Sequence, residues 1–389
     1  MPEAVIVDAI RTPIGRAMKG SLKTVRADDL AATPIRALVE RNPEVNFSET
    51  VDVMMGAASS IGEQGYNVGR NASLLAGIDH HVPACTVNRF CASSLQTLRM
   101  AFHAIKAGEG SAFICVGVES STRSPLGVFC DQPDTQNARL QAGNAEGLPQ
   151  AYMAMGMTAE NVADKYHISR EEMDRYALQS QQRAVQATRD GIFAAEIIPV
   201  PLATGTMTTD DGPRPDTSLE KLAALKPVFR EDGRVTAGNS CPLNDGAAAT
   251  VVMSAALAKE LGITPIARII STGVSSLEPE LMGLGPIEST RQALERAKMT
   301  IGDVDVVEIN EAFAAQVIPS AWGIGVDPFS DKLNPHGGAI ALGHPFGMTG
   351  VRILATLLND LRTCDQAIGL ETMCVGGGQG MAMIIERLS

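Results

Sequence analysis

Val51-Asp52-Val53-Met54-Met55 is a short apolar run that predicts a buried strand, and Val304-Asp305-Val306-Val307 repeats it in the second half of the chain. In each half, an earlier apolar run and a helical pattern precede this strand in the same order. The segments are residues 5–9, 28–41 and 51–55 in the first half, and residues 267–270, 289–298 and 304–307 in the second. Strands that alternate with helices predict βαβ units and a mostly parallel or mixed sheet.

The similarity between the halves continues downstream. Apolar residues at helical spacing over 95–105 precede an apolar run at 113–116, and the same pattern over 353–361 precedes a run at 367–370. The simplest architecture is therefore two similar α/β halves that pack together.

Residues 120–244 interrupt this pattern with polar loops and with a helix that begins at the capping box Ser169-Arg170-Glu171-Glu172 and ends by Gly191. We interpret the segment as a lid inserted between the halves. The sequence from Ala247 to Leu261 predicts a helix that rejoins the first half. The predicted domains are residues 1–119 continued by 245–265, residues 120–244, and residues 266–389.

The composition excludes several classes of protein. The chain has 389 residues and a formal net charge of −12, which argues against nucleic-acid binding because that depends on clustered Lys and Arg. An anionic cofactor must therefore bind at a local cluster of basic residues. The longest stretch of small apolar residues, 247–258, is shorter than the roughly 20 residues of a membrane span, so we expect no membrane span.

The seven cysteines include no C-x-x-C pair and are odd in number, so they indicate neither a zinc knuckle nor a disulfide framework. They occupy positions 85, 91, 115, 130, 241, 364 and 374. The first eight residues predict a strand and not a signal peptide. These features predict a cytoplasmic protein with reduced thiols and no metal site.

Residues 86–95 (T-V-N-R-F-C-A-S-S-L) join an extended run to the start of an apolar-periodic helix, with Cys91 at the junction. Free backbone N–H groups and the helix dipole at that position favour a thiolate, which a nucleophilic cysteine needs. For this segment alone, a buried structural cysteine is the alternative.

A glycine-rich loop at residues 334–350 precedes the last helical pattern. Glycines allow close backbone approach and positive φ angles, which are typical of a site. His344, between Gly343 and Pro345, is a candidate to take a proton from a cysteine, with a structural histidine as the alternative. We interpret His336 in the same loop as a structural or supporting residue.

Two further segments follow predicted strands. Residues 372–380 (T-M-C-V-G-G-G-Q-G) lack the spacing of a dinucleotide-binding loop, but Cys374 could act as acid and base while Cys91 is acylated. The backbone N–H groups of Cys91 and Gly376 are candidate oxyanion donors. In the motif E-I-N-E-A-F-A, Asn310 could hold a water, donate to a second oxyanion or cap a helix.

Four motifs resemble the thiolase family, in order and over nearly the whole chain: N-R-F-C at 88–91, N-E-A-F-A at 310–314, G-G-A-I-A-L-G-H-P at 337–345 and M-C-V-G-G-G at 373–378. The resemblance implies a thiolase-like five-layer αβαβα sandwich. It also implies roles for the candidate residues. Cys91 would be acylated, and His344 would activate it. Cys374 would exchange the α-proton, and Asn310 with His344 would bind the thioester oxygen.

The resemblance extends to the lid and to the binding of CoA. Residues 155–161 (M-G-M-T-A-E-N) resemble the family's M-G-x-T-A-E segment, and residues 236–239 with 244–246 resemble its pantetheine-binding loop. Arg214 matches an arginine that contacts the CoA nucleotide. The residues that the resemblance assigns to binding CoA and its acyl group are Arg214, Cys241, Met155 and Phe313.

The chain departs from the family at three places. Residues 92–94 (A-S-S) replace the common Gly-Ser-Gly after the nucleophile, which affects backbone flexibility and the room near the thioester. Cys241 replaces a serine that touches the pantetheine, and its weaker hydrogen bonding either loosens CoA or reports drift. Residues 118–125 (V-E-S-S-T-R-S-P) lack the usual M-S after the acidic residue, and the lid that follows is short.

The resemblance predicts an acyltransferase that cleaves 3-ketoacyl-CoA with CoA, or runs the reverse Claisen condensation, in fatty-acid β-oxidation. One alternative is a biosynthetic acetyl-CoA C-acetyltransferase that makes acetoacetyl-CoA. Another is a non-catalytic thiolase-like protein that binds acyl-CoA or lipid, although such a protein has no need of two cysteines and His344. A ketoacyl synthase normally places two histidines, or a histidine and an asparagine, opposite the cysteine, and Cys374 argues against it.

Two features favour degradation of medium or longer chains. Biosynthetic members usually carry a histidine before the Met-Gly of the lid and a longer insertion, whereas this chain has Ala154 there and a short lid. Residues 376–382 (G-G-G-Q-G-M-A) also resemble those of fatty-acid oxidation members. The bulky Met348, Phe346 and Phe313 oppose this expectation because they could refill the acyl pocket.

The resemblance implies acyl-CoA and CoA as substrates, with no permanently bound cofactor. The expected partner is a second copy of the chain, in a homodimer or a homotetramer. A hydratase/dehydrogenase subunit is a further candidate partner.

Overall fold

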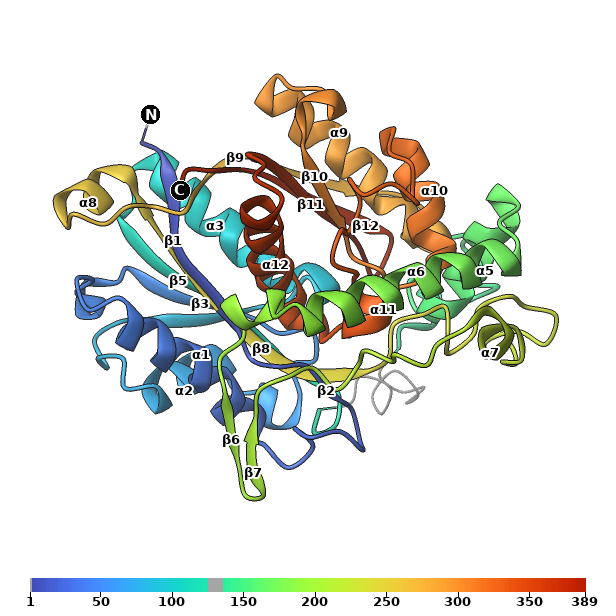
Figure 1. Ribbon diagram of the computed structural model, residues 1–389, viewed down its shortest axis with the longest axis horizontal. Helices are drawn as coiled ribbons and strands as arrows, with labels where there is room; N and C mark the ends of the chain where they lie inside the picture. The colour runs from blue at the N-terminus through green and yellow to red at the C-terminus, as the bar shows by residue number, and fades with distance from the viewer. Residues whose placement is uncertain (1, 125–135) are drawn as a thin grey trace.

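The computed structural model describes residues 2–124 and 136–389, which form a ten-stranded mixed sheet, a separate two-stranded sheet and the helices around them (Figure 1). The strands are β1 (Ala4–Arg11), β2 (Gly15–Arg16), β3 (Asp52–Gly56), β4 (Ala84–Val87), β5 (Ala112–Ser120), β6 (Val200–Leu202), β7 (Gly205–Met207), β8 (Asn244–Ser254), β9 (Ala267–Ser276), β10 (Val306–Ile309), β11 (Ile368–Val375) and β12 (Gln379–Arg387). The α-helices are α1 (Ala27–Arg41), α2 (Val68–Leu75), α3 (Ser93–Ala107), α5 (Met155–Tyr166), α6 (Arg170–Arg189), α7 (Leu219–Ala223), α8 (Ala255–Glu260), α9 (Gly285–Ala297), α10 (Ala314–Ile324), α11 (Ala339–Leu342) and α12 (Thr349–Thr363). Among the described residues, no helix is both long and apolar enough to cross a membrane.

The large sheet consists of two half-sheets with the same topology. The strand order is β4-β3-β5-β8-β1 in the first and β10-β11-β12-β9 in the second. Strands β3 and β5 of the first half-sheet are parallel, as are β10 and β11 of the second. The next two pairs are antiparallel in each: β5 with β8 and β8 with β1 in the first, and β11 with β12 and β12 with β9 in the second. An isolated parallel bridge between Val307 and Leu333 occupies the place that β4 has in the first half-sheet. The predicted pair of similar α/β halves is therefore confirmed.

Five layers result from this arrangement. The half-sheets join where β1 and β9 pair, with Val5 opposite Arg268 and Ile6 opposite Ala267. Helices α3 and α12 contact each other, and one hydrophobic cluster joins them to strands of both half-sheets. A second cluster joins α1 and α2 to the outer face of the first half-sheet, and a third joins α9 and α10 to that of the second. Figure 1 shows this order, with α3 and α12 in the middle, so the αβαβα sandwich is confirmed.

The expectation of a helix from Ala247 to Leu261 is wrong. Residues Asn244–Ser254 form strand β8, and only Ala255–Glu260 form a helix. Every residue of β8 is buried, because α1 contacts one face of its half-sheet while α3 and α12 contact the other. A strand buried on both faces is a continuous apolar run, so periodicity cannot distinguish it from a buried helix. Within the first half-sheet, β8 pairs with β1 and β5.

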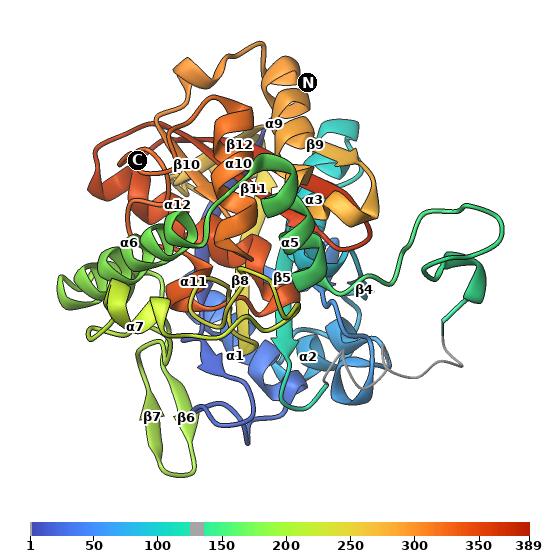
Figure 2. The ribbon, with the colours of Figure 1, turned by 90° about the vertical axis from the view of Figure 1, so that its right-hand side faces the viewer.

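The chain between β5 and β8 contains α5, α6, the β6–β7 hairpin and α7. The predicted capping box is confirmed, because Ser169 Oγ accepts from the Glu172 N–H (3.1 Å) and the Glu172 carboxylate accepts from the Ser169 N–H (2.9 Å). Residues 136–154 extend away from the rest of the chain (Figure 2). Pro125 and Cys130 lie outside the described residues, and the predicted domain boundaries stay a prediction.

Candidate active site

Cys91 lies where the chain leaves strand β4 and enters helix α3. It passes through a single 3₁₀ turn, Phe90–Ala92, and α3 begins at Ser93. Phe90 has a φ of 44°, a left-handed conformation that is uncommon for a bulky residue. The turn is held by the Phe90 N–H, which donates to Asn88 Oδ1 (2.8 Å), and by Ser93 Oγ, which donates to the Phe90 carbonyl (2.6 Å). Cys91 therefore stands at a helix N-terminus.

The N-terminus of α3 packs against three glycines so closely that no side chain would fit at those positions. Gly56 of β3, Gly117 of β5 and Gly350 of α12 surround it. A Cβ atom on Gly56 would lie 2.3 Å from the Ser94 nitrogen, and one on Gly350 would lie 2.2 Å from the Leu95 nitrogen. Elements from both halves of the chain therefore clamp the start of this helix.

The Ala-Ser-Ser sequence at residues 92–94 is built into this packing. All three residues are buried. Ser93 Oγ accepts from the Arg89 N–H (2.9 Å), and Ser94 Oγ accepts from the Val351 N–H (3.1 Å). Ser93 matches the serine of Gly-Ser-Gly, and Ser94 replaces its second glycine. Both hydroxyls thus have hydrogen-bond partners, Ser93 in the segment before Cys91 and Ser94 at the start of α12.

The second cysteine lies near the tip of the hairpin that β11 and β12 form. Cys374 is fully buried, and a three-glycine turn follows it in which Gly377 and Gly378 have φ of 77° and 75°. Glycine adopts these angles without steric cost. The turn places Gly376 against the segment that carries Cys91, because a Cβ atom on Gly376 would lie 3.2 Å from the Phe90 side chain, and the Gly376 N–H lowers the pKa of Cys91. Two cysteines from opposite halves of the chain therefore share one site.

His344 lies between α11 and α12, and both of its ring nitrogens are occupied. Nε2 is 3.2 Å from Asn310 Nδ2, and Nδ1 is 2.7 Å from Thr349 Oγ1. Because the Thr349 hydroxyl donates its proton to the Pro345 carbonyl (2.8 Å), it must accept from Nδ1–H. This assigns the ring proton to Nδ1 and leaves Nε2 to accept from Asn310. Within the described residues, no hydrogen bond joins His344 to a cysteine.

Burial controls the charge of all three titratable groups. It raises the pKa of the Cys91 thiol to about 12, although the N–H groups of Gly376 and of Cys91 itself lower that pKa. Burial also raises the pKa of Cys374, and it lowers the pKa of His344 to about 3, with the Arg352 charge adding to the effect. Desolvation therefore outweighs the N–H groups that were expected to favour a thiolate. The resting site holds two thiols and a neutral imidazole.

A buried carboxylate, to which the sequence assigned no role, joins two loops of the site to the end of β5. Glu119, at the end of β5, accepts from the backbone N–H groups of Ala58 (2.9 Å), Ser59 (3.1 Å) and Gly347 (2.8 Å). Burial raises the pKa of Glu119, and these hydrogen bonds oppose the rise. The available signal was an acidic residue at the end of an otherwise apolar strand.

Glu311 is a second buried carboxylate that joins segments of the site, in this case to the lid. It follows Asn310 in the chain and accepts from the hydroxyls of Tyr176 (3.0 Å) and Ser180 (2.6 Å), both on α6. It also accepts from the Ile340 N–H (3.1 Å) in the histidine loop. Through Glu311, the strand end that carries Asn310 is joined to the lid and to the loop that carries His344.

A pocket with a basic lining lies where the lid meets the first half. Its cationic residues are Arg16, Arg214 and Lys221, and Lys221 Nζ is also paired with Asp216 (2.6 Å). The predicted pantetheine segment contributes Ala237, Gly238 and Pro242 to the same lining. Asp216 also lines the pocket, so the three cations leave it with a net positive charge, which suits an anionic ligand. Arg214 is the predicted CoA residue among them.

The other three residues predicted to bind CoA lie outside this lining. Cys241 and Phe313 are on adjoining segments, and the Cys241 N–H donates to the Ala312 carbonyl (3.0 Å). Met155 begins α5. All three belong to, or pack against, the hydrophobic cluster that contains Cys374. The structure therefore puts these three residues in or against the hydrophobic cluster of Cys374 and outside the lining that contains Arg214.

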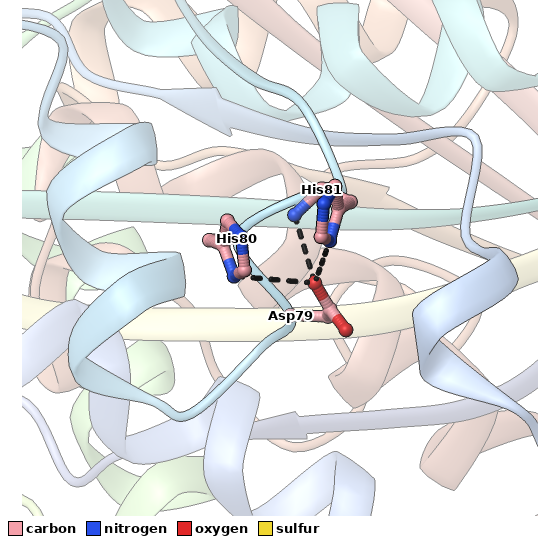
Figure 3. Close-up of side chains that lie close together, drawn as sticks. All are labelled: Asp79, His80 and His81. Carbon is pink, nitrogen blue, oxygen red and sulfur yellow. Dashed lines mark hydrogen bonds and ion pairs between the residues drawn. The ribbon is translucent and has the colours of Figure 1, made fainter.

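Asp79, His80 and His81 are described residues whose donor atoms lie close enough together to hold a metal ion (Figure 3). Asp79 Oδ1 is 2.9 Å from His81 Nδ1 and 3.6 Å from His80 Nδ1. The three residues are consecutive and exposed, and Asp79 Oδ1 already accepts from the His81 N–H (2.8 Å). They form a self-contained surface group.

Two family descriptions match the chain: "Thiolase, N-terminal domain" over residues 4–256 and "Thiolase, C-terminal domain" over residues 263–387. A Pseudomonas aeruginosa protein named beta-ketoadipyl-CoA thiolase is 45% identical over 401 residues, which cover 99% of each chain. An Idiomarina loihiensis protein named 3-ketoacyl-CoA thiolase is 45% identical over 395 residues, which cover 100% of each chain. The crystal structure of the Bacillus anthracis acetyl-CoA acetyltransferase has a TM-score of 0.90 and 38% identity, over 100% of this chain and 99% of that one.

Proposed function

The chain belongs to the thiolase family of acyltransferases, and on this premise we propose that it cleaves 3-ketoacyl-CoA with CoA into acetyl-CoA and a shortened acyl-CoA. One observation carries the proposal: the Gly376 turn lies against the segment of Cys91, where the Gly376 N–H lowers the Cys91 pKa, and a second buried thiol, Cys374, lies in the same site. Two thiols suit a reaction in which one sulfur carries an acyl group while the other moves a proton.

In the first half of the reaction, Cys91 gives its proton to Nε2 of His344 and its sulfur attacks the 3-keto carbon. The N–H groups of Cys91 and Gly376 stabilise the oxygen that becomes negative. The C2–C3 bond then breaks and its electron pair forms the enolate of acetyl-CoA, whose oxygen is bound by His344 and Asn310. The Cys374 thiol donates its proton to C2, and acetyl-CoA leaves an acyl group on Cys91.

In the second half, the CoA thiol gives its proton to the Cys374 thiolate and its sulfur attacks the acyl carbon. The bond between the acyl group and Cys91 breaks, and the Cys91 thiolate recovers its proton from His344. Cys91, Cys374 and His344 have then returned to their starting protonation states, and the net proton transfer is from the CoA thiol to C2 of acetyl-CoA. Burial raises the pKa of both cysteines, so each thiolate is a strong base that is ready to take a proton back.

We assign the phosphates of CoA to the basic pocket. Arg16, Arg214 and Lys221 supply positive charge there, and arginine binds phosphate oxygens in a bidentate manner. The pantetheine arm would follow Ala237 and Gly238 toward the cysteines. No permanently bound cofactor is needed, because CoA enters and leaves as a substrate.

We infer a degradative substrate with a medium or longer acyl chain. Ala154 precedes the Met-Gly of α5, which leaves more room for an acyl tail than a histidine would. Each additional buried methylene contributes about 0.8 kcal/mol of binding. The names of the relatives add support, since one is called a 3-ketoacyl-CoA thiolase and another a beta-ketoadipyl-CoA thiolase.

The biosynthetic alternative, condensation of two acetyl-CoA molecules to acetoacetyl-CoA, has two observations in its favour. The similar Bacillus anthracis protein is named an acetyl-CoA acetyltransferase. Phe313 and Phe346 are also large residues of the site. The Phe346 ring packs edge to face against the His344 ring, and the two ring centroids are 4.9 Å apart. Both phenylalanines would narrow the space for an acyl tail.

The deciding measurement is kcat/KM for thiolysis along a series of straight-chain 3-ketoacyl-CoAs from four carbons upward, with 3-oxoadipyl-CoA as a separate arm. We expect kcat/KM to rise beyond four carbons. A steady fall beyond four carbons would favour the biosynthetic alternative, and a maximum at 3-oxoadipyl-CoA would favour a dicarboxylic substrate. Cys91→Ser is the control, because it should neither turn over nor form the acyl adduct that intact-protein mass spectrometry detects without free CoA.

We also propose that the chain works as a homodimer or homotetramer in the cytoplasm. Among the described residues, strand β4 is an edge of the large sheet and pairs only with β3, and such an edge can be covered by a second copy. Sedimentation equilibrium distinguishes a monomer from a dimer or a tetramer. Co-purification of a hydratase/dehydrogenase subunit would show whether the chain works in a larger assembly.

A further inference from the structure

The two N–H groups that lower the pKa of the Cys91 thiol come from opposite halves of the chain, and the Gly376 turn packs against Phe90 of the segment that carries Cys91. One belongs to Cys91 at the start of α3, and the other belongs to Gly376 in the turn between β11 and β12. That turn consists of three consecutive glycines, so its backbone has little intrinsic preference for one orientation. A contact outside the turn must therefore hold the Gly376 peptide in place.

Side-chain hydrogen bonds connect the turn to the segment that carries the nucleophile. Arg89 Nη1 donates to Gln379 Oε1 (2.9 Å), and Gln379 Nε2 donates to the Gly376 carbonyl (3.1 Å). The Gln379 amide has only one useful orientation. A flipped amide would turn its NH₂ group toward the guanidinium and its oxygen toward the carbonyl.

Arg89 is itself fixed to the start of α3. Its Nε donates to Gln96 Oε1 (2.9 Å), and its backbone N–H donates to Ser93 Oγ (2.9 Å). Gln96 and Ser93 are both buried residues of the first turns of the helix. Because Arg89 lies two positions before Cys91, its guanidinium moves with the nucleophile as part of one segment.

We propose that Arg89 and Gln379 are positioning residues that aim the Gly376 N–H at the reacting centre. The inference rests on the proposed function, since an oxyanion donor matters only if Cys91 is acylated. In the resting site, the same N–H group lowers the pKa of Cys91 against the effect of burial. Without the tether the glycine turn can rotate, which weakens both the contact with the thiol and the stabilisation of the oxyanion.

Three variants distinguish a role in positioning the Gly376 peptide from general structural support of the site. Gln379→Ala removes both hydrogen bonds of the amide, and Arg89→Ala removes the other end of the connection. Gln379→Glu keeps an acceptor for Arg89 but has no N–H for the Gly376 carbonyl. Arg36→Ala is the matched control, because it deletes an exposed arginine of α1 whose partner is the Leu75 carbonyl. Urea unfolding of each variant verifies that it is folded.

Two rates are measured for each variant: alkylation of Cys91 by iodoacetamide as a function of pH, and single-turnover acylation by acetoacetyl-CoA without free CoA. Removing an oxyanion donor costs about 10²–10³-fold in rate, so a loosened donor is expected to slow acylation by about 10- to 100-fold in all three variants. The pH profile of alkylation should move to higher pH. Because both residues act through Gly376, the Arg89→Ala/Gln379→Ala double variant should be no slower than the slower single variant. Arg36→Ala should match the wild type.

Recovery of both wild-type rates in Gln379→Glu would overturn the proposal, because Gln379 would then serve only as an acceptor for Arg89. Additive losses in the double variant, or an alkylation profile that does not move, would also overturn it. Alkylation needs no acyl-CoA. A wild-type chain that is alkylated at Cys91 but never acylated would therefore refute the proposed function separately from the positioning role.

Discussion

Replacing Thr349 by valine tests whether the ring proton of His344 has to stay on Nδ1. Thr349 accepts from Nδ1–H at 2.7 Å and donates to the Pro345 carbonyl at 2.8 Å. Valine has nearly the same shape but no hydroxyl, so the variant leaves a buried N–H group without a partner. The proton can then move to Nε2, where it faces the Asn310 NH₂ group instead of leaving a lone pair to accept from it.

The expected size of the effect follows from this lost contact. A buried donor without a partner costs about 1–3 kcal/mol. Since about 1.4 kcal/mol corresponds to a factor of ten, the active tautomer should be depleted by about 5- to 150-fold. We expect kcat for thiolysis to fall by a similar factor in Thr349→Val. Thr349→Ser keeps the hydroxyl and should stay close to the wild-type kcat.

Two measurements check this prediction. Steady-state kcat is obtained from the loss of acetoacetyl-CoA absorbance in the presence of CoA, and the ¹⁵N chemical shifts of the two ring nitrogens report which one carries the proton. Urea unfolding gives the free energy of unfolding, which should fall by no more than about 3 kcal/mol. A Thr349→Val enzyme with the wild-type kcat, or with the proton still on Nδ1 of His344, would refute the reasoning.

Three further predictions concern the cysteines and the packing around them. Cys374→Ser should lose about 10²–10⁴-fold in turnover while Cys91 still reacts with iodoacetamide, and equal loss of alkylation would mean that Cys374 maintains the structure instead. Because burial raises the pKa of Cys91 to about 12 and only the thiolate reacts, the alkylation rate should rise about tenfold per pH unit between pH 7 and 10. A plateau below pH 9 would contradict this. Gly350→Ala places a Cβ 2.2 Å from the Leu95 nitrogen and should lower the free energy of unfolding by about 1–3 kcal/mol, whereas Gly302→Ala, whose Cβ meets only one side-chain oxygen at 3.5 Å, should not. Equal losses in the two glycine variants would refute the packing argument.

Most elements of both halves could be predicted because their local apolar patterns repeat in the same order along the chain. Helices α3 and α12 follow from apolar residues at helical spacing, and the order of strands and helices repeats in each half. Strand β8 marks the limit of this reasoning. It is buried on both faces, so its apolar run from Ala247 carries no period, and only its neighbours β1 and β5 decide that it is a strand.

The sequence by itself determined which reactive groups this protein has: a cysteine at a helix start, a histidine in a glycine-rich loop, and a second cysteine beside a glycine turn. These are local properties, since each depends on a few adjacent residues. Only the tertiary structure decided which groups touch and what charge they carry. Gly376 reaches Phe90 beside Cys91, Asn310 reaches His344, and Arg89 reaches Gln379 only after the two halves have packed around α3 and α12. The pKa of Cys91 rises and that of His344 falls for the same physical reason, because the packed layers exclude the water that would stabilise a charge on either group.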